Sequence, residues 1–412
     1  MRPILTATLC IGLAAAAHAQ TKPADPIGHP VRFGIMTDMS GPLAALAGPG
    51  AVLAGEMAAE DCLAAECAGM TIEVISADHQ NKPDIAVGIF RDWVDNKGVT
   101  AVGDIIQASV QIAIQHEAAA KNKIALFSGG TSRLTNEDCA PATSVMWMWD
   151  TYGQAIGITK PLAKPGSKWF TIVADYAFGV SLEQDSAKLI KAAGGEVVGA
   201  IRHPFGFTGD FSSFLLQAQG SPANIIAIGS SGSDLVTMLK QAREFGIGAS
   251  KKQALASFVL TTADVSALGL ETTQGVLTNE AFYWNLDDAT RAFSRRFAAR
   301  NKGRMPTTIQ AGDYAVARAY FAAVAAAKTT DTAPVIAKLH ELPVSGPLIK
   351  NGSIRPDGRV VHDTYLFRVK KPSESREPYD FYDLVATIPA AEAFRPLADT
   401  ACPALMTTAA AK

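Results

Sequence analysis

The sequence has no long apolar run after its N-terminus and no excess of charge of either sign. A membrane-spanning helix needs about 18 or more consecutive apolar residues, and no stretch beyond residue 19 reaches that length. The formal net charge is −2, without a basic stripe or a block of like charges. We therefore expect no membrane span in the rest of the chain and no nucleic-acid partner.

Catalytic and cofactor motifs are also missing. The chain has no Gly-x-Ser-x-Gly, His-Glu-x-x-His, P-loop or Cys-x-x-Cys sequence. Gly48 and Gly50 follow an expected strand, but the third glycine of a dinucleotide fingerprint is absent. The histidines are scattered without the spacing of metal ligands. These absences predict a protein without enzymatic activity, cofactor or metal.

The first nineteen residues have the pattern of a secretory signal peptide. Arg2 supplies a positive charge, an apolar run follows from Ile4 to Ala17, and Ala17-His18-Ala19 is a small-x-small cleavage signal. The apolar run is too short to span a bilayer. We expect cleavage after Ala19 and export of the rest of the chain from the cytoplasm.

Cysteine is scarce, with five in the whole chain and one of them, Cys10, inside the signal. An even number in an oxidising compartment predicts disulfides, and four cysteines allow three connectivities. We favour a local Cys62–Cys67 bridge and a Cys139–Cys402 bridge that ties down the C-terminal tail. Free buried thiols are the alternative.

Beyond residue 30, apolar runs of about six residues alternate with amphipathic stretches of about fifteen, which is typical of βαβ units. Two such series occur. The predicted fold is therefore α/β, with two doubly wound parallel-sheet lobes joined by a hinge that the chain crosses several times. The first series has expected strands at Val31–Thr37, Thr71–Ala77, Val99–Gly103 and Lys123–Phe127, and expected helices at Leu43–Cys62, Asp84–Lys97 and Ser109–Lys121.

The segment Cys139–Tyr152 interrupts the alternation, which then restarts as a second lobe. Three helical runs and a β-hairpin follow. The expected strands are Trp169–Ala174, Glu196–Arg202, Ala223–Gly229 and Ser257–Thr261, the helices lie near 181–193, 211–219, 233–245, Asp287–Asn301, Thr307–Lys328 and Thr332–His340, and the hairpin strands are Val361–Val369 and Phe381–Ala386.

The length beyond the signal exceeds what one hydrophobic core usually serves, so two domains are expected. We assign residues 30–149 and about 279–360 to lobe 1. Residues 150–278 and about 361–390 form lobe 2, and residues 391–412 form a C-terminal tail.

Small polar residues follow three strands of the first lobe, in the loops Asp38–Pro42, Ile105–Ser109 and Ser128–Ser132. Ligands of open α/β sheets bind beyond the carboxyl ends of the strands, near helix N-termini that suit a carboxylate. We expect these loops to hold a ligand. Simple turns and helix caps are the alternative.

In the second lobe, the loop Asp175–Gly179 carries two aromatic residues that could cover a ligand's apolar body. The loops Gly229–Ser233 and Thr261–Asp264 end neighbouring strands. Tyr152, near the first crossing between the lobes, either lines the cleft or packs the hinge.

Taken together, these loops resemble a known family. The chain resembles the periplasmic solute-binding proteins of branched-chain amino acid ABC transporters, which are leucine-binding-protein-like and have the type I periplasmic binding fold. The resemblance covers about residues 30–390, and its strength lies in the order and spacing of the motifs. The matching segments are Gly34–Pro42, Ser128–Thr135, Asp175–Gly179, Met238–Gly246 and Pro306–Tyr314.

The resemblance implies a ligand carboxylate held by first-lobe loops and an aromatic clamp on the second lobe. Members that bind α-amino acids also place an acid on the second lobe; here the acid is Asp264, one residue from the usual position. This departure favours the members that bind aromatic or other organic acids. The residues carried over are Gln107, Ser109, Gly130, Thr131 and Ser132 for the carboxylate, Phe178 with Tyr176 for the clamp, and Ser231 as a further contact.

The predicted function is that of a periplasmic solute-binding protein. It would capture a small carboxylate, either an amino acid or an aromatic or organic acid, and deliver it to an ABC-transporter permease. We expect a monomer without a cofactor. The alternatives are a sensing module that reports ligand occupancy to a membrane receptor, and an exported α/β enzyme using Ser128 or Asp175.

Overall fold

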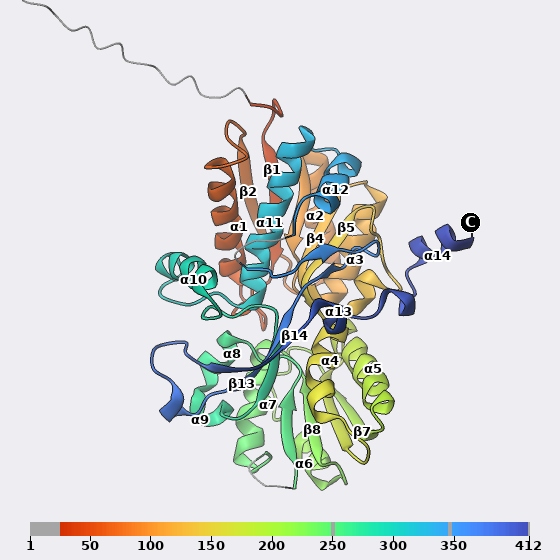
Figure 1. Cartoon of the computed structure of the whole chain (residues 1–412), viewed down its shortest axis with the longest axis vertical. Coiled ribbons are helices and arrows are strands. Elements are labelled where there is room, and N and C mark those ends of the chain that lie inside the picture. The colour runs from red at the N-terminus through yellow and green to blue at the C-terminus, as the bar shows by residue number, and fades with distance from the viewer. Residues whose placement is uncertain (1–24, 249–251, 345–347, 411–412) are drawn as a thin grey trace, which may run out of the picture.

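The computed structural model describes residues 25–248, 252–344 and 348–410, and shows two lobes stacked along the long axis (Figure 1). The predicted signal peptide, residues 1–19, lies outside these ranges. Within them, no helix has the length and apolar character needed to cross a membrane.

The first lobe is built on a five-stranded parallel sheet in the order β2-β1-β3-β4-β5. Apart from β2, its strands are almost wholly buried because helices cover both faces of the sheet. The strands are β1 (Val31–Thr37), β2 (Ile72–Asp78), β3 (Val99–Asp104), β4 (Ile124–Gly130) and β5 (Ser144–Asp150).

Two pairs of helices cover this sheet. Successive side chains of β1 alternate between the two faces, so Phe33 packs against Tyr320 with ring centroids 5.3 Å apart, while Met36 belongs to the opposite core. One pair is α1 (Gly48–Leu63) and α11 (Thr308–Ala327), on which α12 (Thr332–Glu341) packs, and the other is α2 (Pro83–Asn96) and α3 (Ala108–Ala120).

The second lobe has a parallel sheet in the order β7-β6-β8-β9 and an antiparallel sheet in the order β10-β13-β14. The strands are β6 (Lys168–Ala174), β7 (Glu196–His203), β8 (Ile225–Gly229), β9 (Ala254–Ser257), β10 (Leu277–Glu280), β13 (Thr364–Val369) and β14 (Tyr382–Ile388). The helices are α4 (Thr151–Leu162), α5 (Ala177–Ala192), α6 (Ser212–Gly220), α7 (Gly232–Glu244), α8 (Thr262–Leu268) and α9 (Leu270–Thr273).

Among the described residues, the chain passes between the lobes at three places before its C-terminal segment returns to the first lobe. It leaves the first sheet after β5, returns between β10 and α10 (Asp288–Arg300), and crosses again between β12 (Val360–Val361) and β13. A short hairpin of β11 (Ser353–Ile354) and β12 lies beside β5. The crossings lie near the predicted divisions at about 150, 279 and 361, and the division itself stays a prediction.

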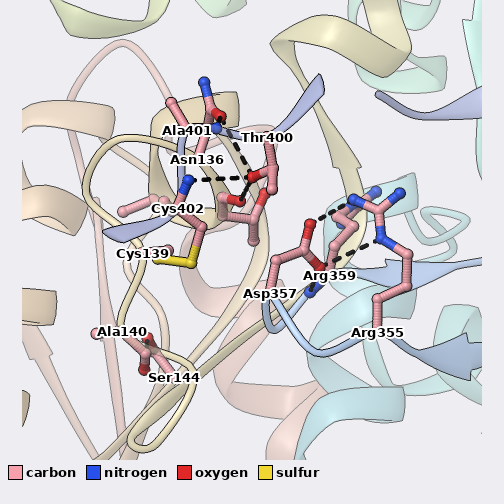
Figure 2. The surroundings of a disulfide bond; sticks show 12 residues. Asn136, Cys139, Ala140, Ser144, Arg355, Asp357, Arg359, Thr400, Ala401 and Cys402 are labelled. Atoms are coloured by element: carbon pink, nitrogen blue, oxygen red, sulfur yellow. Dashed lines mark hydrogen bonds and ion pairs between the residues drawn. A yellow bond between two sulfur atoms is a disulfide. The ribbon is translucent and has the colours of Figure 1, made fainter. Parts of the chain in front are cut away.

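The C-terminal segment returns to the lobe boundary after β14, shown in dark blue in Figure 1. It contains α13 (Ala390–Ala393), a short 3-10 turn (Leu397–Asp399) and α14 (Pro403–Ala410). Both predicted disulfides are present: Cys62–Cys67 is local, and Cys139–Cys402 joins residues 263 positions apart (Figure 2).

The α/β fold class is confirmed, but three element predictions are wrong. The segment 139–152 does not merely interrupt the pattern, because it contains β5, which is buried on both faces. The strand predicted at 257–261 ends at Ser257. The first helix begins at Gly48 rather than Leu43, because residues 43–47 form turns such as the Leu46 N–H to Leu43 carbonyl bond of 3.0 Å.

Candidate functional site

The loop after β4 in the first lobe contacts α5 of the second lobe directly. The Thr131 and Ser181 hydroxyls are 2.8 Å apart, and the Ser132 hydroxyl donates to Asp185 Oδ2 at 2.8 Å. All four residues are buried. We call residues 129–132 the β4 loop; its predicted ligand-binding hydroxyls lie at the closed boundary between the lobes.

Two glycines allow other groups to approach the β4 loop. A Cβ atom on Gly130 would lie 2.0 Å from Oε1 of Gln111, whose Nε2 donates to the Gly129 carbonyl at 2.5 Å. A Cβ atom on Gly129 would lie 2.8 Å from Ile309 and 3.0 Å from the Trp149 ring. The small residues therefore bring α3, α11 and β5 up to the end of β4.

Aromatic rings lie beside this loop. Phe178, at the start of α5, is 3 % exposed and packs edge-on against Trp149 with ring centroids 5.9 Å apart. Tyr176 stacks on Phe178 at 6.0 Å and also contacts Phe205 at 4.5 Å. Burial raises the pKa of Tyr176, while a hydrogen bond with the Ser231 side chain opposes the rise. The phenol therefore stays uncharged at neutral pH.

A second contact between the lobes forms at the start of α7. The Ser233 N–H donates to the Pro42 carbonyl at 3.2 Å. Gly232 has φ +60°, and a Cβ atom on it would lie 2.1 Å from the same carbonyl oxygen. Only a residue without a side chain fits this closed arrangement.

The structure thus brings together five of the predicted site residues around one lobe boundary. Thr131 and Ser132 contribute hydroxyls from the first lobe. Tyr176 and Phe178 contribute rings from the second lobe, and Ser231 contacts Tyr176. Their role in ligand binding stays a prediction.

Four other predicted residues have different surroundings. Gln107 Oε1 accepts from the Val110 N–H at 2.8 Å and caps α3, where Ser109 lies half-buried in the first turn. Asp264 Oδ2 accepts from Thr261 N–H and hydroxyl and caps α8. Tyr152 faces the C-terminal segment.

Tyr152 lies beside the C-terminal segment rather than beside Phe178. The Arg395 guanidinium lies 4.7 Å from the centroid of the Tyr152 ring. Tyr152 also lines a pocket of about 420 Å³ with Leu189 and Phe394. Of the two alternatives for this residue, packing at the hinge fits these contacts.

Glu280, at the end of β10, was not expected from the sequence. It is 3 % exposed, and burial raises its pKa well above the usual value. The nearby Asp264 charge raises the pKa further. Burial therefore disfavours the charged form of Glu280. Nothing in the local sequence Thr-Asn-Glu marks it as a site residue.

Several buried polar atoms around this boundary lack a hydrogen-bond partner among the described residues. They include Nε1 of Trp149, Oγ1 of Thr262 and Oε2 of Glu280. Leaving such an atom unpaired costs about 1–3 kcal/mol. These atoms are candidates for contacts with the polar groups of a ligand.

Two buried carboxyl groups, those of Asp104 and Asp313, lie inside the first lobe. Asp104, at the end of β3, has φ +67° and is 1 % exposed. Burial raises its pKa to about 7. Burial also raises the pKa of Asp313 on α11 well above the usual value, as does the Asp104 charge, and Asp313 accepts a hydrogen bond from Ser128.

Replacing Asp104 by asparagine is expected to change the pH dependence of stability. The pKa of Asp104 is raised in the folded state. Its contribution to stability is therefore complete below pH 3.8, the usual pKa of an aspartate, and is lost as the pH rises through about 7. The unfolding free energy of Asp104→Asn relative to the wild type should therefore increase by about 1 kcal/mol between pH 6 and 8. Urea titrations at both pH values measure this difference, in which the titrating groups that do not interact with Asp104 cancel; a constant difference would contradict the assignment.

Comparison with known proteins places this geometry in a family. The sequence profile of periplasmic binding proteins matches residues 30–375. A periplasmic binding protein from Burkholderia mallei is 42 % identical, with a TM-score of 0.84, over 90 % of this chain and 98 % of that one. No curated protein matches the chain.

Two further structures are similar. A periplasmic ligand-binding protein of a branched-chain amino acid ABC transporter from Burkholderia xenovorans is 37 % identical, with a TM-score of 0.80, over 90 % of this chain and 99 % of that one. A solute-binding protein from R. palustris in complex with benzoate is 19 % identical, with a TM-score of 0.77, over 91 % of this chain and 100 % of that one. At this identity, the similarity shows the fold alone. The chain belongs to the periplasmic binding protein family, with the two-lobe type I fold of the binding proteins of branched-chain amino acid ABC transporters.

Proposed function

We propose that the protein captures a small carboxylate between its lobes and delivers it to the permease of an ABC importer, without chemical turnover. The observation that carries this proposal is the direct meeting of Thr131 and Ser132 with α5 beside Phe178. We also propose that the signal is cleaved after Ala19 and that the protein acts as a monomer in the periplasm.

The chemistry of the boundary suits an acid with an apolar body. The Thr131 hydroxyl of the β4 loop can donate to a carboxylate, whereas both donors of Ser132 are engaged by Asp185 and Thr151. The rings of Trp149, Tyr176 and Phe178 can cover the body. An ammonium group is less well served, because Asp264 caps α8 and burial disfavours the charged form of Glu280 by raising its pKa. We therefore propose an aromatic or other organic acid rather than an α-amino acid as the ligand.

A thermal-shift screen followed by calorimetry tests this choice. The panel contains benzoate, 4-hydroxybenzoate, leucine and short aliphatic carboxylates. A ligand at 100 times its dissociation constant adds about 2.7 kcal/mol to stability, which is readily detected. We expect an aromatic or organic acid to stabilise the protein and leucine to have no effect. Stabilisation by leucine alone would overturn the ligand class, and no response to any carboxylate would overturn the function.

Replacing Gly232 by alanine is expected to weaken ligand binding roughly tenfold. The new methyl group would meet the Pro42 carbonyl oxygen only when the lobes are closed. Such overpacking costs about 1–3 kcal/mol, and a cost confined to the closed state lowers affinity by the same amount. Calorimetry with the best ligand of the panel measures the change.

Gly246→Ala is the matched control, because Gly246 lies at the other end of α7. Its φ is +71°, but a Cβ atom there meets nothing within 4 Å. Both variants carry backbone strain, and only Gly232→Ala blocks closure. Equal affinities of the two variants would mean that binding does not require this contact.

A further inference from the structure

We propose that the C-terminal segment 389–402, here called the strap, positions the β4 loop through Arg395 and so sets ligand affinity. The proposal rests on the proposed function and adds to it a residue far from the ligand loops in sequence. Its basis is a chain of hydrogen bonds that runs from the strap through Asp185 to Ser132.

Asp185 is the centre of this chain. Its Oδ2 accepts from the Ser132 hydroxyl at 2.8 Å and from the Thr151 hydroxyl at 2.9 Å. Its Oδ1 accepts from Arg395 Nη2 at 2.7 Å. The Thr151 hydroxyl in turn accepts from the Ser132 N–H at 3.0 Å. One buried carboxylate therefore joins the β4 loop, the start of α4, α5 and the strap.

Arg395 supplies the charge that this carboxylate needs. Burial raises the pKa of Asp185, and the Arg395 charge is the largest opposing influence, followed by the hydrogen bonds from Ser132 and Thr151. Without Arg395 the buried carboxylate would have no cationic partner in this network. It would then take up a proton or move toward water, and either change alters its bond to Ser132.

The strap is anchored to the first lobe. The Cys139–Cys402 disulfide holds its end, and the Ala401 N–H donates to Asn136 Oδ1 at 2.5 Å, as Figure 2 shows. Arg355 Nη1 donates to the backbone carbonyl of Arg395 itself at 2.6 Å. The backbone that carries the Arg395 side chain is therefore fixed.

The strap also contacts the second lobe. Glu392 forms an ion pair with Lys160 on α4, in addition to the pair between Arg395 and Asp185 on α5. The strap thus spans the lobe boundary close to the β4 loop. A change in its position reaches Ser132 without passing through the hinge strands.

The test compares Arg395→Gln with Arg395→Lys and the wild type. Calorimetry with benzoate, or the best ligand of the panel, measures affinity, and hydrogen exchange of residues 129–135 in the ligand-free protein measures the order of the loop. We expect Arg395→Gln to weaken binding roughly 3- to 30-fold and to speed exchange in the loop. Arg395→Lys keeps a cation beside Asp185 and should restore most of both properties.

Arg91→Gln is the control. Arg91 on α2 forms a two-bond pair with Glu117 on α3, with Nη2 2.7 Å from Oε1, but this pair is exposed, and its hydrogen bonds do not involve the β4 loop, α5 or the strap. It should leave affinity and exchange unchanged. The double variant Cys139→Ser/Cys402→Ser releases the end of the strap and should shift both readouts in the same direction as Arg395→Gln.

The outcomes separate this proposal from the proposed function. If the wild type binds a ligand and Arg395→Gln binds it equally well, the strap proposal is overturned, whatever the exchange shows. If the wild type binds nothing in the panel, the proposed function fails, and hydrogen exchange alone decides the strap. Unchanged exchange in Arg395→Gln then overturns it, and faster exchange reversed by lysine supports it.

Discussion

Replacing Phe178 with alanine is expected to weaken ligand binding by about 30-fold or more. The ring lies between Tyr176 and Trp149, and Thr131 and Ser132 contact the same helix. Buried aromatic residues at the centre of a binding site typically contribute about 2 kcal/mol or more, which corresponds to that change in affinity. Calorimetry with the best ligand of the panel measures it.

The same substitution also removes a buried ring and lowers stability, so a control must separate the two effects. Phe293→Ala serves this purpose. Phe293 is 4 % exposed, also lies on a helix, and packs on Tyr314 with ring centroids 4.7 Å apart. We expect a similar loss of stability with unchanged affinity. Unchanged ligand affinity in folded Phe178→Ala would contradict the site assignment. An equal loss of ligand affinity in both variants would contradict it as well.

Replacing Arg359 with alanine is expected to lower the free energy of unfolding by about 3–5 kcal/mol. Arg359 is fully buried, and its Nε lies 3.1 Å from Asp150 Oδ2, at the first crossing between the lobes. It donates to the Met148 carbonyl at 2.9 Å, and its guanidinium lies 4.0 Å from the centroid of the Phe394 ring. Burial lowers its pKa to about 10, so it is charged at neutral pH.

Removing one partner of such a pair leaves an uncompensated buried charge on Asp150, which is the source of the large effect. Arg91→Ala is the control, because Arg91 pairs with Glu117 at 2.7 Å with 57 % of its side chain exposed. Exposed pairs contribute about 1 kcal/mol or less. Urea titration of both variants measures the losses. A loss in Arg359→Ala no larger than in Arg91→Ala would contradict its role at the crossing.

The two-lobe fold could be predicted because the main sheet of each lobe is parallel and covered on both faces. Strands such as Ile124–Gly130 then carry no charged residue and stand out against the amphipathic helices between them. Burial on both faces also explains why β5 was not predicted. Its run of tryptophan and methionine residues shows no alternation, and no amphipathic helix separates it from β4.

The site could be predicted where chemistry follows the end of a strand. Thr131 and Ser132 follow β4 of the first sheet, and Tyr176 and Phe178 follow β6 of the second. Because ligands of such sheets bind beyond the carboxyl ends of the strands, these residues could be grouped by position alone. Arg395 could not, because it lies 210 residues beyond Asp185 and reaches it only through the path of the C-terminal segment.

Two of the predicted site residues cap helices in the structure, for a local reason. Gln107 and Asp264 precede or begin helices, where a side-chain oxygen can satisfy the helix's own N–H groups or the cap residue. A loop polar residue can therefore serve the helix instead of a ligand. Sequence position alone does not distinguish these two uses.

The most direct test of ligand capture between the lobes is a crystal structure of the protein with the carboxylate that binds most tightly. We expect the ligand to lie between the β4 loop and the rings of Tyr176 and Phe178, with both lobes in contact with it. A ligand bound to one lobe alone, away from Thr131 and Ser132, would contradict this view of the protein.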